Sequence, residues 1–439
     1  MPERDPETDG GCSTPPRCLE DWLTLIEARH PREIDLGLER IAQVAARLAL
    51  PALARKQVVV AGTNGKGSCV RTLEAIALAR GLRVGAYTSP HILSYNERLR
   101  LQGEPIGDEA LCAAFAAVEA VRGDISLTYF EMGTLAAMHI MAAAALDLAI
   151  LEVGMGGRFD AVNIVDADLA VITAIDIDHA DWLGNSRDAI AAEKAGVARA
   201  GRPVVCCDPD PPPGLLTALA QVSAKLFFIG ADFGAKTEAA ERFDAFFCGP
   251  GGAQAFGALP VPRLPLPSVL AAIEAAFLLG YAPDHALLAD VLTNVTLPGR
   301  FQMLTWRGKT LVLDVAHNPA AAAFLARRLA DTGREVVAVA ALMADKDRAG
   351  FIAALQPVVS AWCCPDLAVP RALPGAELAA RVRAAGCRGA AFASVGDAVE
   401  KALAMCDKDG IIVACGSFHT ISAVMKYIDA SSPGGRHDL

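Results

Sequence analysis

Short apolar runs alternate with amphipathic segments along most of the chain, and this pattern predicts an α/β fold with largely parallel sheets. In the first half, apolar runs predict strands at residues 58–61, 83–87, 147–153, 168–178, 204–207 and 226–229. Apolar residues at helical spacing predict two helices within residues 18–50 and others at residues 70–80, 108–121, 185–199 and 269–279. This order of strands and helices is that of an open α/β domain.

The alternation restarts after the stretch TLPGRFQ at residues 296–302. Apolar runs at residues 310–315, 336–340, 361–364, 391–393 and 411–415 predict a second α/β unit with helices between its strands. We therefore expect a disordered tail over residues 1–17, a larger domain with a parallel-rich sheet over 18–296, a linker over 297–300 and a smaller Rossmann-like domain over 301–439.

The composition indicates a compact globular protein and argues against several classes of partner. Of the 439 residues, 53% are apolar and 21% are charged, which is unlike a disordered chain. The net charge of −10 and the lack of a basic stripe argue against nucleic acid. Apolar runs such as residues 132–151 contain polar interruptions, which argues against a membrane span. The twelve cysteines form no zinc pattern, so we expect free thiols in the cytoplasm.

The stretch VVVAGTNGKGS at residues 58–68 has the features of a phosphate-binding loop. A β-branched strand leads into a glycine-rich turn, and a helix follows at once. Glycines let backbone N–H groups close around phosphate oxygens, and the N-terminus of the helix attracts the anion. We expect Lys66 to reach the terminal phosphates and Ser68 to lie near a bound Mg²⁺. A plain tight turn is the alternative, and the order of these features favours nucleotide binding.

Two polar residues follow buried strands on either side of the strand that leads into this loop. Glu152 offers the hard oxygen ligands that Mg²⁺ prefers. His179 is a less usual ligand for that ion, and a hydrogen-bonded loop residue is its alternative interpretation. For Glu152 the alternative is a cap for the following GMGG turn. Their shared position at one sheet edge favours a metal site.

Three further polar residues are ambiguous from their local sequence alone. Lys194 follows a glutamate on a predicted helix, where a lysine is normally a solvated charge. Asp314 and His317 end the first predicted strand of the second domain. They belong either to a turn that leads into a helix capped by Asn318 before Pro319, or to a nucleotide site between the domains.

Eight ordered motifs resemble those of the folate branch of the Mur ligases, which comprises folylpolyglutamate synthases and the bifunctional dihydrofolate synthase/folylpolyglutamate synthases of bacteria. They are GTNGKGS, TSPHI with NERLR, SLTYFE, LEVGMGGRFDAVN, DHADWLG with EKAG, LPGRFQ, DVAHNP and CGSFHT. Together they extend from about residue 34 to residue 430. The loop departs from the usual P-loop pattern, because Val60 replaces the first glycine and Gly67 separates Lys66 from Ser68.

The resemblance implies a role for each matching residue. The implied nucleotide contacts are Gly62, Thr63, Asn64, Gly65, Lys66, Gly67, Ser68, Ser268, Arg300, Asp314 and His317. The implied Mg²⁺ ligands are Ser89, Glu152 and His179, and the implied catalytic residues are Lys66, Lys194 and His179. Lys194 matches a lysine that the family carries as a carbamate. The implied dihydropteroate pocket comprises Thr128, Tyr129, Phe130, Glu131, Phe159, Asp160 and Ala161. Because the family usually has Asn where this chain has Ser268, we expect a weaker or water-mediated contact there.

The resemblance also implies an activity: an ATP-dependent ligase that joins L-glutamate to 7,8-dihydropteroate and to the γ-carboxylate of tetrahydrofolate glutamates through an acyl phosphate. ATP and Mg²⁺ are expected, with two metal ions and a monovalent cation, in a protein that acts as a monomer on small molecules. A folylpolyglutamate synthase without dihydropteroate activity is the first alternative, against which SLTYFE and IDLGLER argue. The others are a nucleotide-switched binding protein and a cell-wall ligase.

Overall fold

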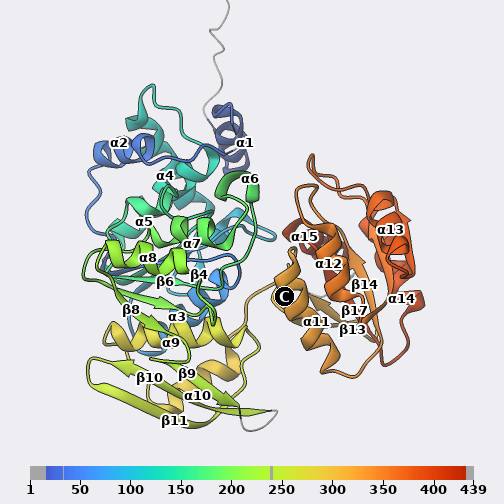
Figure 1. The fold of residues 1–439 in the computed structure, drawn as a ribbon. Helices are drawn as coiled ribbons and strands as arrows, with labels where there is room; N and C mark the ends of the chain where they lie inside the picture. Colours follow the sequence, from blue (N-terminus) through green and yellow to red (C-terminus); the bar gives the residue numbers. More distant parts are fainter. Residues whose placement is uncertain (1–15, 33, 238–240, 432–439) are drawn as a thin grey trace, which may run out of the picture.

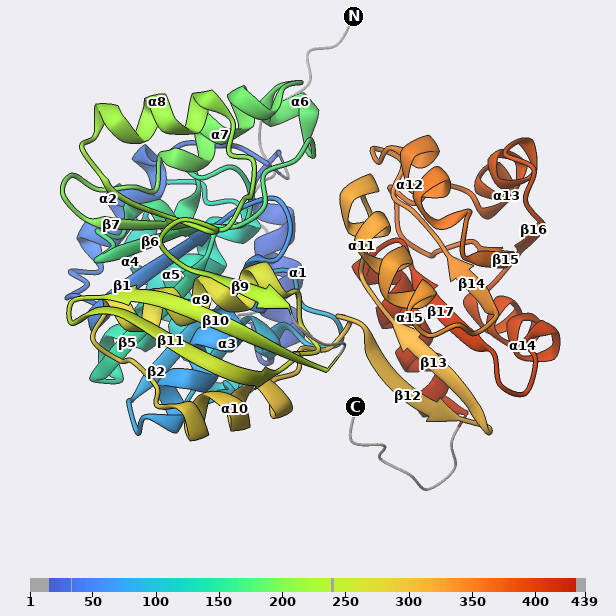
Figure 2. The same ribbon diagram turned by 60° about the horizontal axis from the view of Figure 1, so that its bottom comes forward.

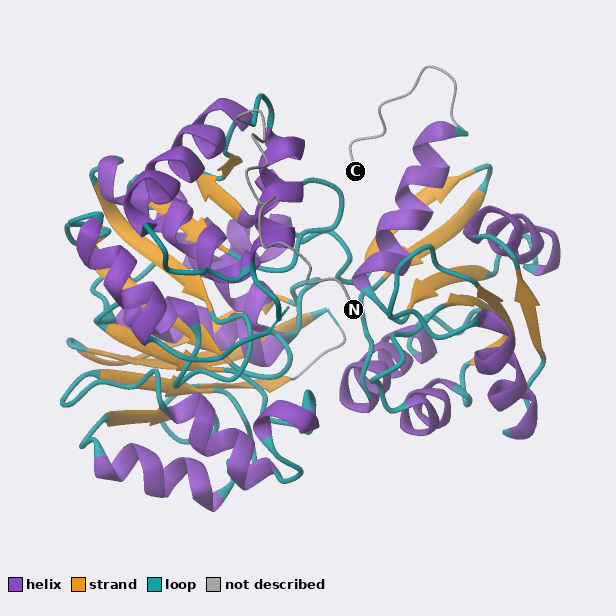
Figure 3. Cartoon of the chain, turned by 90° about the horizontal axis from the view of Figure 1, so that it is seen from above, coloured by secondary structure: helices purple, strands orange, loops and turns teal. Residues whose placement is uncertain are grey.

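The computed structural model describes residues 16–32, 34–237 and 241–431. The predicted tail over residues 1–17 therefore falls almost wholly outside the described residues. The described chain forms two bodies that lie side by side and are joined near residue 300 (Figure 1). Helices surround a sheet in each body, as the view from above shows (Figure 3). The predicted α/β fold class, with a separate smaller C-terminal domain, is confirmed.

The N-terminal domain is built on an eight-stranded sheet with the order β4-β3-β2-β5-β1-β6-β7-β8. Its strands are β1 (Ala54–Ala61), β2 (Val84–Tyr87), β3 (Leu99–Leu101), β4 (Glu104–Pro105), β5 (Leu146–Glu152), β6 (Leu169–Ile172), β7 (Pro203–Cys206) and β8 (Lys225–Phe228). Only β3 and β4 run antiparallel to their neighbours. Because β1 lies between β5 and β6, the loops after these three strands meet at one edge of the sheet.

The side chains of alternate residues in β1 pack into two separate apolar cores, one on each face of the sheet. Because both faces are buried, the sequence of this strand is continuously apolar. Val58 and Val60 pack on one face with α3 (Lys66–Ala79) and α9 (Leu266–Leu278). Val59 packs on the other face with α5 (Tyr129–Ala143), α7 (Arg187–Ala195) and α8 (Pro213–Gln221). Each buried valine contributes about 1.5–3 kcal/mol to the stability of the fold. The strand that leads into the phosphate loop is thus anchored from both sides.

Further helices form a layer over the predicted pteroate motifs. They are α1 (Leu19–Arg29), α2 (Glu39–Arg47), α4 (Asp108–Arg122) and the short helices η1 (Tyr95–Arg98) and η2 (Ala161–Ile164). The short helix α6 (Ala180–Leu183) packs beside α7 instead. A separate apolar cluster centred on Trp22, Ile41 and Phe115 holds this layer to α5. The two helices predicted within residues 18–50 are confirmed as α1 and α2.

A third layer was not predicted from the sequence. The antiparallel strands β9 (Gly234–Thr237), β10 (Arg242–Gly249) and β11 (Gly252–Pro260) cover α9 and α10 (His285–Asn294), as Figure 2 shows. Helix α9 is consequently buried on nearly all sides, which explains its alanine-rich sequence. The apolar alternation is weak, above all in β11, where few residues are buried, and prolines follow these strands, so no clear strand pattern is visible in the sequence.

The C-terminal domain is a six-stranded sheet with the order β12-β13-β17-β14-β15-β16. Its strands are β12 (Gln302–Trp306), β13 (Lys309–Leu313), β14 (Val336–Ala340), β15 (Val359–Pro365), β16 (Gly389–Phe392) and β17 (Ile411–Cys415). The helices α11 (Pro319–Ala330), α12 (Arg348–Leu355), α13 (Gly375–Ala384), α14 (Val395–Met405) and α15 (Phe418–Ala430) cover both faces. All five predicted strands are present, and the unpredicted β12 adds an antiparallel edge.

One strand prediction was wrong in length. The strand predicted over residues 168–178 ends at Ile172, and the chain then turns to contact the phosphate loop. Thr63 donates its backbone N–H to the Ala174 carbonyl at 2.7 Å, and its hydroxyl donates to the Asp176 carbonyl at 3.0 Å. These bonds replace the ladder that a longer strand would form. Within the described ranges, no helix has both the length and the apolar character needed to cross a bilayer.

A buried carboxyl group in α9 makes the stability of the N-terminal domain depend on pH. Glu274 is fully buried; one oxygen accepts the Cys248 N–H at 3.0 Å, and the other has no partner among the described residues. Burial raises the pKa of Glu274 from about 4.5 to about 7. The unfolded chain ionises at lower pH than the folded one, so stability is lost as pH rises from about 4.5 to about 7.

We expect Glu274→Gln to remove this pH dependence and to raise stability at pH 8 by roughly 1–3 kcal/mol relative to wild type. Urea unfolding at several pH values measures the change. Glu104→Gln, at an exposed position, is the control, and we expect it to leave the dependence of the unfolding free energy on pH unchanged. The same pH dependence in the Glu274→Gln and wild-type proteins would contradict the raised pKa of Glu274.

Candidate active site

A cavity of about 430 Å³ lies where the strand ends of the two domains face each other. The turns after β1, β2, β5 and β6 line it from the N-terminal domain, and the turn after β13 lines it from the C-terminal domain. Every predicted nucleotide, metal and catalytic residue is found in its lining: Gly62, Thr63, Asn64, Gly65, Lys66, Gly67, Ser68, Ser89, Glu152, His179, Lys194, Ser268, Arg300, Asp314 and His317. The roles assigned to these residues remain predictions.

The phosphate loop owes its shape to two glycines with positive φ angles. Gly62 has φ +145°, and Gly65 has φ +92° immediately before the first turn of α3. A Cβ atom on Gly62 would lie 1.7 Å from the Thr173 hydroxyl, and one on Gly65 would lie 2.1 Å from the Ser268 hydroxyl. Only glycine fits at either position, so the loop is held tightly between β6 and α9.

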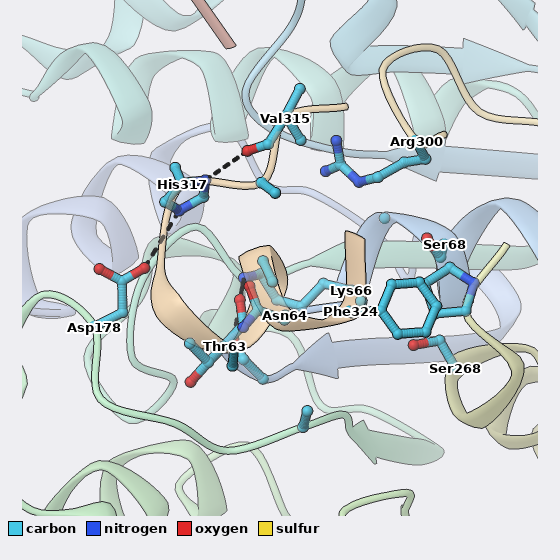
Figure 4. A pocket seen from close by; sticks show the side chains of 18 of the residues that line it. Thr63, Asn64, Lys66, Ser68, Asp178, Ser268, Arg300, Val315, His317 and Phe324 are labelled. Atoms are coloured by element: carbon cyan, nitrogen blue, oxygen red, sulfur yellow. Dashed lines mark hydrogen bonds and ion pairs between the residues drawn. The ribbon is translucent and has the colours of Figure 1, made fainter. Parts of the chain in front are cut away.

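Lys66 lies over its own loop. Its ammonium donates to the Gly62 carbonyl at 3.0 Å and to the Thr63 carbonyl at 3.4 Å. Burial lowers the pKa of Lys66, and the nearby Glu152 carboxylate opposes that change. The lysine is thus placed at the N-terminus of α3, where anions are attracted. Figure 4 shows it among Thr63, Asn64 and Ser68.

Two side chains with hard oxygen atoms, Ser68 and Glu152, line the cavity together with this lysine. The buried Ser68 hydroxyl has no hydrogen-bond partner among the described residues. Glu152 is 5% exposed and accepts the Ser89 N–H at 3.3 Å. Burial raises the pKa of Glu152, while Lys66 and Arg300 oppose that change. An unpartnered hydroxyl and a carboxylate suit Mg²⁺, which prefers hard oxygens and keeps several sites for water or phosphate.

His179 follows β6 by seven residues and not directly, because that strand ends early. It has φ +51° and precedes α6 at the cavity wall. Burial lowers the pKa of His179 to about 4, so the imidazole is neutral at pH 7 and able to bind a metal. In the described ranges, no group of three or more His, Cys, Asp or Glu side chains is arranged to hold a metal. A cation here therefore needs further ligands from substrate or water.

Lys194 is a buried amine in the cavity wall. It lies on α7 and is 3% exposed. Burial, followed by repulsion from Lys66, lowers the pKa of Lys194 to about 7. The GMGG turn packs directly on this helix, because a Cβ atom on Gly157 would lie 2.8 Å from the Glu193 carbonyl. Lys194 is therefore not the solvated surface charge of the alternative interpretation.

The C-terminal domain supplies Arg300, Asp314 and His317. The Arg300 guanidinium lies 5.1 Å from the centre of the Phe418 ring. Asp314 accepts the N–H groups of Phe301 and Ala316, each at 2.8 Å, and so shapes the turn after β13. In Figure 4, His317 lies between the Val315 carbonyl and the Asp178 carboxylate. Asn318 caps α11 before Pro319, as the sequence predicted. The turn thus caps a helix and also lines the cavity.

The chain is similar to known proteins over most of its length. Residues 60–204 match the Mur ligase middle domain, and residues 299–418 match the Mur ligase glutamate ligase domain. A dihydrofolate synthase/folylpolyglutamate synthase from Escherichia coli is 42% identical over 95% of this chain and 97% of its own length. The chain belongs to the Mur ligases, in the dihydrofolate synthase/folylpolyglutamate synthase branch.

Solved structures agree with this assignment. E. coli FolC in complex with DHPP and ADP matches with a TM-score of 0.89 and 40% identity, covering 94% of this chain and 98% of that one. A bifunctional folylpolyglutamate synthase/dihydrofolate synthase with Mn, AMPPNP and L-glutamate bound matches with a TM-score of 0.86 and 42% identity, covering 95% and 100%. Members of this Mur ligase branch are ATP-dependent ligases.

The predicted pteroate residues lie beside the cavity and not in its lining. Thr128 and Glu131 form a capping box at the start of α5, and Glu131 also pairs with Arg40 at 3.1 Å. Asp160 caps η2, whose first residue, Ala161, is buried in the cluster under α1 and α2. These residues have structural partners that the sequence alone did not reveal.

The aromatic members of the set are closer to the cavity. Phe130 packs against Gly154, a lining residue, where a Cβ atom would lie 2.7 Å from the ring. Tyr129 stacks edge-on with Tyr95, and Phe159 is 46% exposed. The Gly37 N–H of the IDLGLER segment donates to the Phe159 carbonyl at 3.3 Å. The motifs SLTYFE, LEVGMGGRFDAVN and IDLGLER therefore contact one another beside the cavity. Their role in pteroate binding stays a prediction.

Several residues that line the cavity were not predicted from the sequence. Phe324, Arg327 and Arg328 of α11 and Asp178 of the loop after β6 line the cavity, and Lys346 pairs with Asp178 at 2.6 Å. The α11 residues show only ordinary helical spacing, so no sequence signal marked them. Asp178 stands next to His179 in the DHADWLG motif, which was the available signal.

The packing of Ser268 against Gly65 yields a test of the loop geometry. We expect Gly65→Ala to weaken ATP binding more than tenfold, because the new Cβ atom strains a positive φ and meets the Ser268 hydroxyl. The double variant Gly65→Ala/Ser268→Ala removes the clash and recovers part of the loss. Calorimetric titration with ATP measures both.

Gly81→Ala is the matched control. Gly81 has a similar φ of +74° with nothing within 4 Å of the added Cβ atom, so it carries the strain without the clash. We expect its ATP affinity to equal that of the wild type. Equal affinity in the Gly65→Ala protein would show that the loop tolerates a side chain there.

Proposed function

We propose that this protein is an ATP-dependent ligase that joins L-glutamate to 7,8-dihydropteroate, and to the γ-carboxylate of tetrahydrofolate glutamates. The observation that carries the proposal is the single cavity that gathers the phosphate loop, Glu152 and Lys194 of one domain with Arg300 and His317 of the other. The names of the relatives and the compounds in the related structures support the choice of substrates.

The chemistry begins with a carboxylate, which is a poor acyl donor because its oxygen does not leave. Transfer of the γ-phosphoryl group of ATP to that oxygen gives an acyl phosphate and ADP. The glutamate amine attacks the acyl carbon, and inorganic phosphate leaves from the tetrahedral intermediate as the amide forms. An amine that loses its proton before attack supplies the required lone pair.

The cavity residues fit the charges that this reaction moves. Lys66 and the N–H groups at the start of α3 neutralise the phosphoryl oxygens during transfer. Ser68, Glu152, Ser89 and His179 are the proposed Mg²⁺ ligands, and the ion would neutralise the same oxygens as a Lewis acid. Enclosure between two domains keeps water away from the acyl phosphate, which hydrolysis would otherwise destroy.

A direct assay tests the proposal. We expect ADP release to require L-glutamate together with either dihydropteroate or tetrahydrofolate. Lys66→Met should lower kcat at least a hundredfold, because it removes a cation at the transferring phosphoryl group. Lys56→Met is the control: it removes a half-exposed lysine near the other end of β1 and leaves kcat unchanged.

The alternatives give different results in the same assay. ADP release that requires neither L-glutamate nor a pteroate or folate substrate would indicate a nucleotide-switched binding protein. It would contradict the ligase proposal. Activity with tetrahydrofolate alone would indicate a monofunctional folylpolyglutamate synthase. Two relatives that match over nearly their full length carry the name dihydrofolate synthase/folylpolyglutamate synthase, and this favours the bifunctional form.

We also propose that Lys194 reacts with carbon dioxide to form a carbamate. Only a neutral amine can attack carbon dioxide, and burial lowers the pKa of Lys194 to about 7, so much of it is neutral at physiological pH. The product is an anion. It would remove the repulsion between two buried lysines, Lys66 and Lys194, and would supply an oxygen ligand near the proposed metal site.

Carbon-13 NMR with labelled bicarbonate tests this modification. We expect a carbamate signal whose intensity, at constant carbon dioxide pressure, rises with pH through about 7 as the amine loses its proton. Lys194→Arg keeps a cation that cannot be carbamylated, and we expect it to lose both the signal and most of kcat. An active wild-type protein without the signal would contradict the carbamate.

We place the enzyme in the cytoplasm. The described cysteines are free thiols, and many of them are buried. Burial raises the pKa of the Cys69 thiol, so this group stays protonated and unreactive. A chain with this many unpaired thiols suits a reducing compartment.

A further inference from the structure

Three groups of the C-terminal domain converge on one carboxylate of the N-terminal domain. One oxygen of Asp178 accepts a hydrogen bond from the Lys346 ammonium at 2.6 Å. The other lies 3.3 Å from His317 Nε2 and 3.3 Å from Asn318 Nδ2. The side chains of Asp178 and Lys346 are only 10% and 9% exposed, so solvent screens this ion pair weakly. Losing Lys346 would leave the Asp178 carboxylate buried without its closest cation, whereas losing Asp178 would leave Lys346 with only the more distant Asp345, at 3.6 Å.

The phosphate loop makes a second connection to the same place. Asn64 donates its amide N–H to the Asn318 side-chain oxygen at 3.1 Å, and Asn318 donates to the Asn64 oxygen at 3.0 Å. Asn318 is 3% exposed and also caps α11 by accepting the Ala321 N–H. The N-terminus of α11 is therefore hydrogen-bonded to the phosphate loop through these two amide side chains. We call the set Asn64, Asp178, His317, Asn318 and Lys346 the interdomain clasp.

The backbone around Asp178 completes the connection. Residues 174–176 are tied to Thr63 by its N–H bond to the Ala174 carbonyl and by a reciprocal pair between its hydroxyl and the backbone of Asp176. Asp178 is thus fixed relative to the phosphate loop within the N-terminal domain. Any group that it holds takes a defined position relative to the loop.

The clasp complements a different attachment at the linker. Ile92 of the N-terminal domain is 7% exposed and packs among C-terminal residues, and its Cδ1 would lie 2.9 Å from a Cβ atom on Gly299. In Figure 4, Asp178 and Arg300 lie on opposite sides of the labelled loop residues. A linker and an apolar contact of Ile92 and Leu93 still permit rotation about that point. Arg328 of α11 donates a further hydrogen bond to the Arg263 carbonyl of the N-terminal domain. The clasp adds a buried ion pair across the cavity and restricts this rotation further.

We propose that Asp178 is a positioning residue: with Lys346 as its counter-ion, it holds the C-terminal domain at the angle that completes the cavity over the phosphate loop. Asp178 acts through His317 and Asn318, which it orients, and not on the reacting atoms. The kinetic part of this inference rests on the proposed ligase activity, whereas its structural part can be measured without it.

The first experiment separates nucleotide binding from turnover. In Asp178→Asn and in Lys346→Met, the loop and its glycines are intact, so we expect the Kd for ADP to stay within about threefold of wild type. We expect kcat to fall at least tenfold, because Arg300 and His317 no longer meet the loop in a fixed geometry. Lys346→Arg keeps the charge and should recover most of kcat.

The second experiment measures the domains themselves. Fluorescence energy transfer between one dye at position 104 and another at position 408 reports their separation in the full chain, and we expect a broader and longer distance distribution in both clasp variants. In a double-mutant cycle, the Asp178→Asn/Lys346→Met protein should lose no more kcat than either single variant, because both changes break one interaction.

The matched control breaks an ion pair inside one domain. Arg83 Nε lies 3.2 Å from Asp147, which is 15% exposed on its side chain, and both residues belong to the N-terminal domain. Asp147→Asn should lower stability without changing the distance between the dyes. Glu400→Gln removes an exposed pair with Arg307 and should change neither distance nor kcat.

The proposal is overturned if folded Asp178→Asn and Lys346→Met proteins keep the wild-type distance distribution, or if their effects on kcat multiply in the double variant. If the wild-type protein had no ligase activity, the distance measurement would still show whether the clasp fixes the relative position of the two domains. If the clasp variants kept the wild-type distances in an active ligase, only the clasp would fail.

Discussion

The cavity depends on a backbone that turns sharply from β1 into α3, so that the first turn of this helix lines the cavity. That turn needs glycine at positions 62 and 65, because Thr173 and Ser268 occupy the space where side chains would begin. The same contacts that exclude side chains also hold the loop still. Because β1 is buried on both faces, the loop starts from a fixed strand, and its geometry is set before any ligand arrives.

The charged residues around this loop are placed at a cost in stability. Lys66, Glu152, Lys194 and Arg300 all carry titratable groups into a poorly solvated space, and burial alone disfavours each charge. Glu152 opposes the lowering of the pKa at Lys66 and Arg300, and Asp178 and Asp160 oppose it at Lys194, yet burial still lowers the pKa of all three cations. A polyanionic ligand with a divalent cation would balance this set. Sites of this kind commonly trade stability for function.

Much of the fold and most of the cavity could be predicted because their signals are local. Glycine spacing, a β-branched strand and a following helix are neighbours in sequence, so the strand, the turn and the helix start at residues 58–68 could be predicted. Glu152 could be placed beside them because buried parallel strands are recognisable and end at a common edge. Strands β9–β11 were missed because their alternation is weak, and their stability comes from packing on α9 and α10. No local pattern carries that information.

The interdomain contacts were beyond prediction for a related reason. Lys346 and Asp178 are 168 residues apart, and neither stands in a pattern that requires the other. The strand predicted over residues 168–178 also hid the turn that delivers Asp178. Tertiary contact with Thr63 overrode the apolar pattern there, which local propensity cannot anticipate. Hydrogen bonds and ion pairs between distant segments are properties of the assembled fold.

The contrast between the two interdomain attachments has a consequence for how the enzyme works. Ile92 is apolar and buries surface at the linker, where the domains stay joined whatever their angle. The clasp across the cavity is polar, and polar pairs can exchange their partners for water at a modest net free-energy difference. An attachment of that kind suits an opening that must admit ATP and release ADP in every cycle. A large apolar interface at the same place would hold the cavity shut, and an absent one would leave Arg300 and His317 without a defined position over the loop.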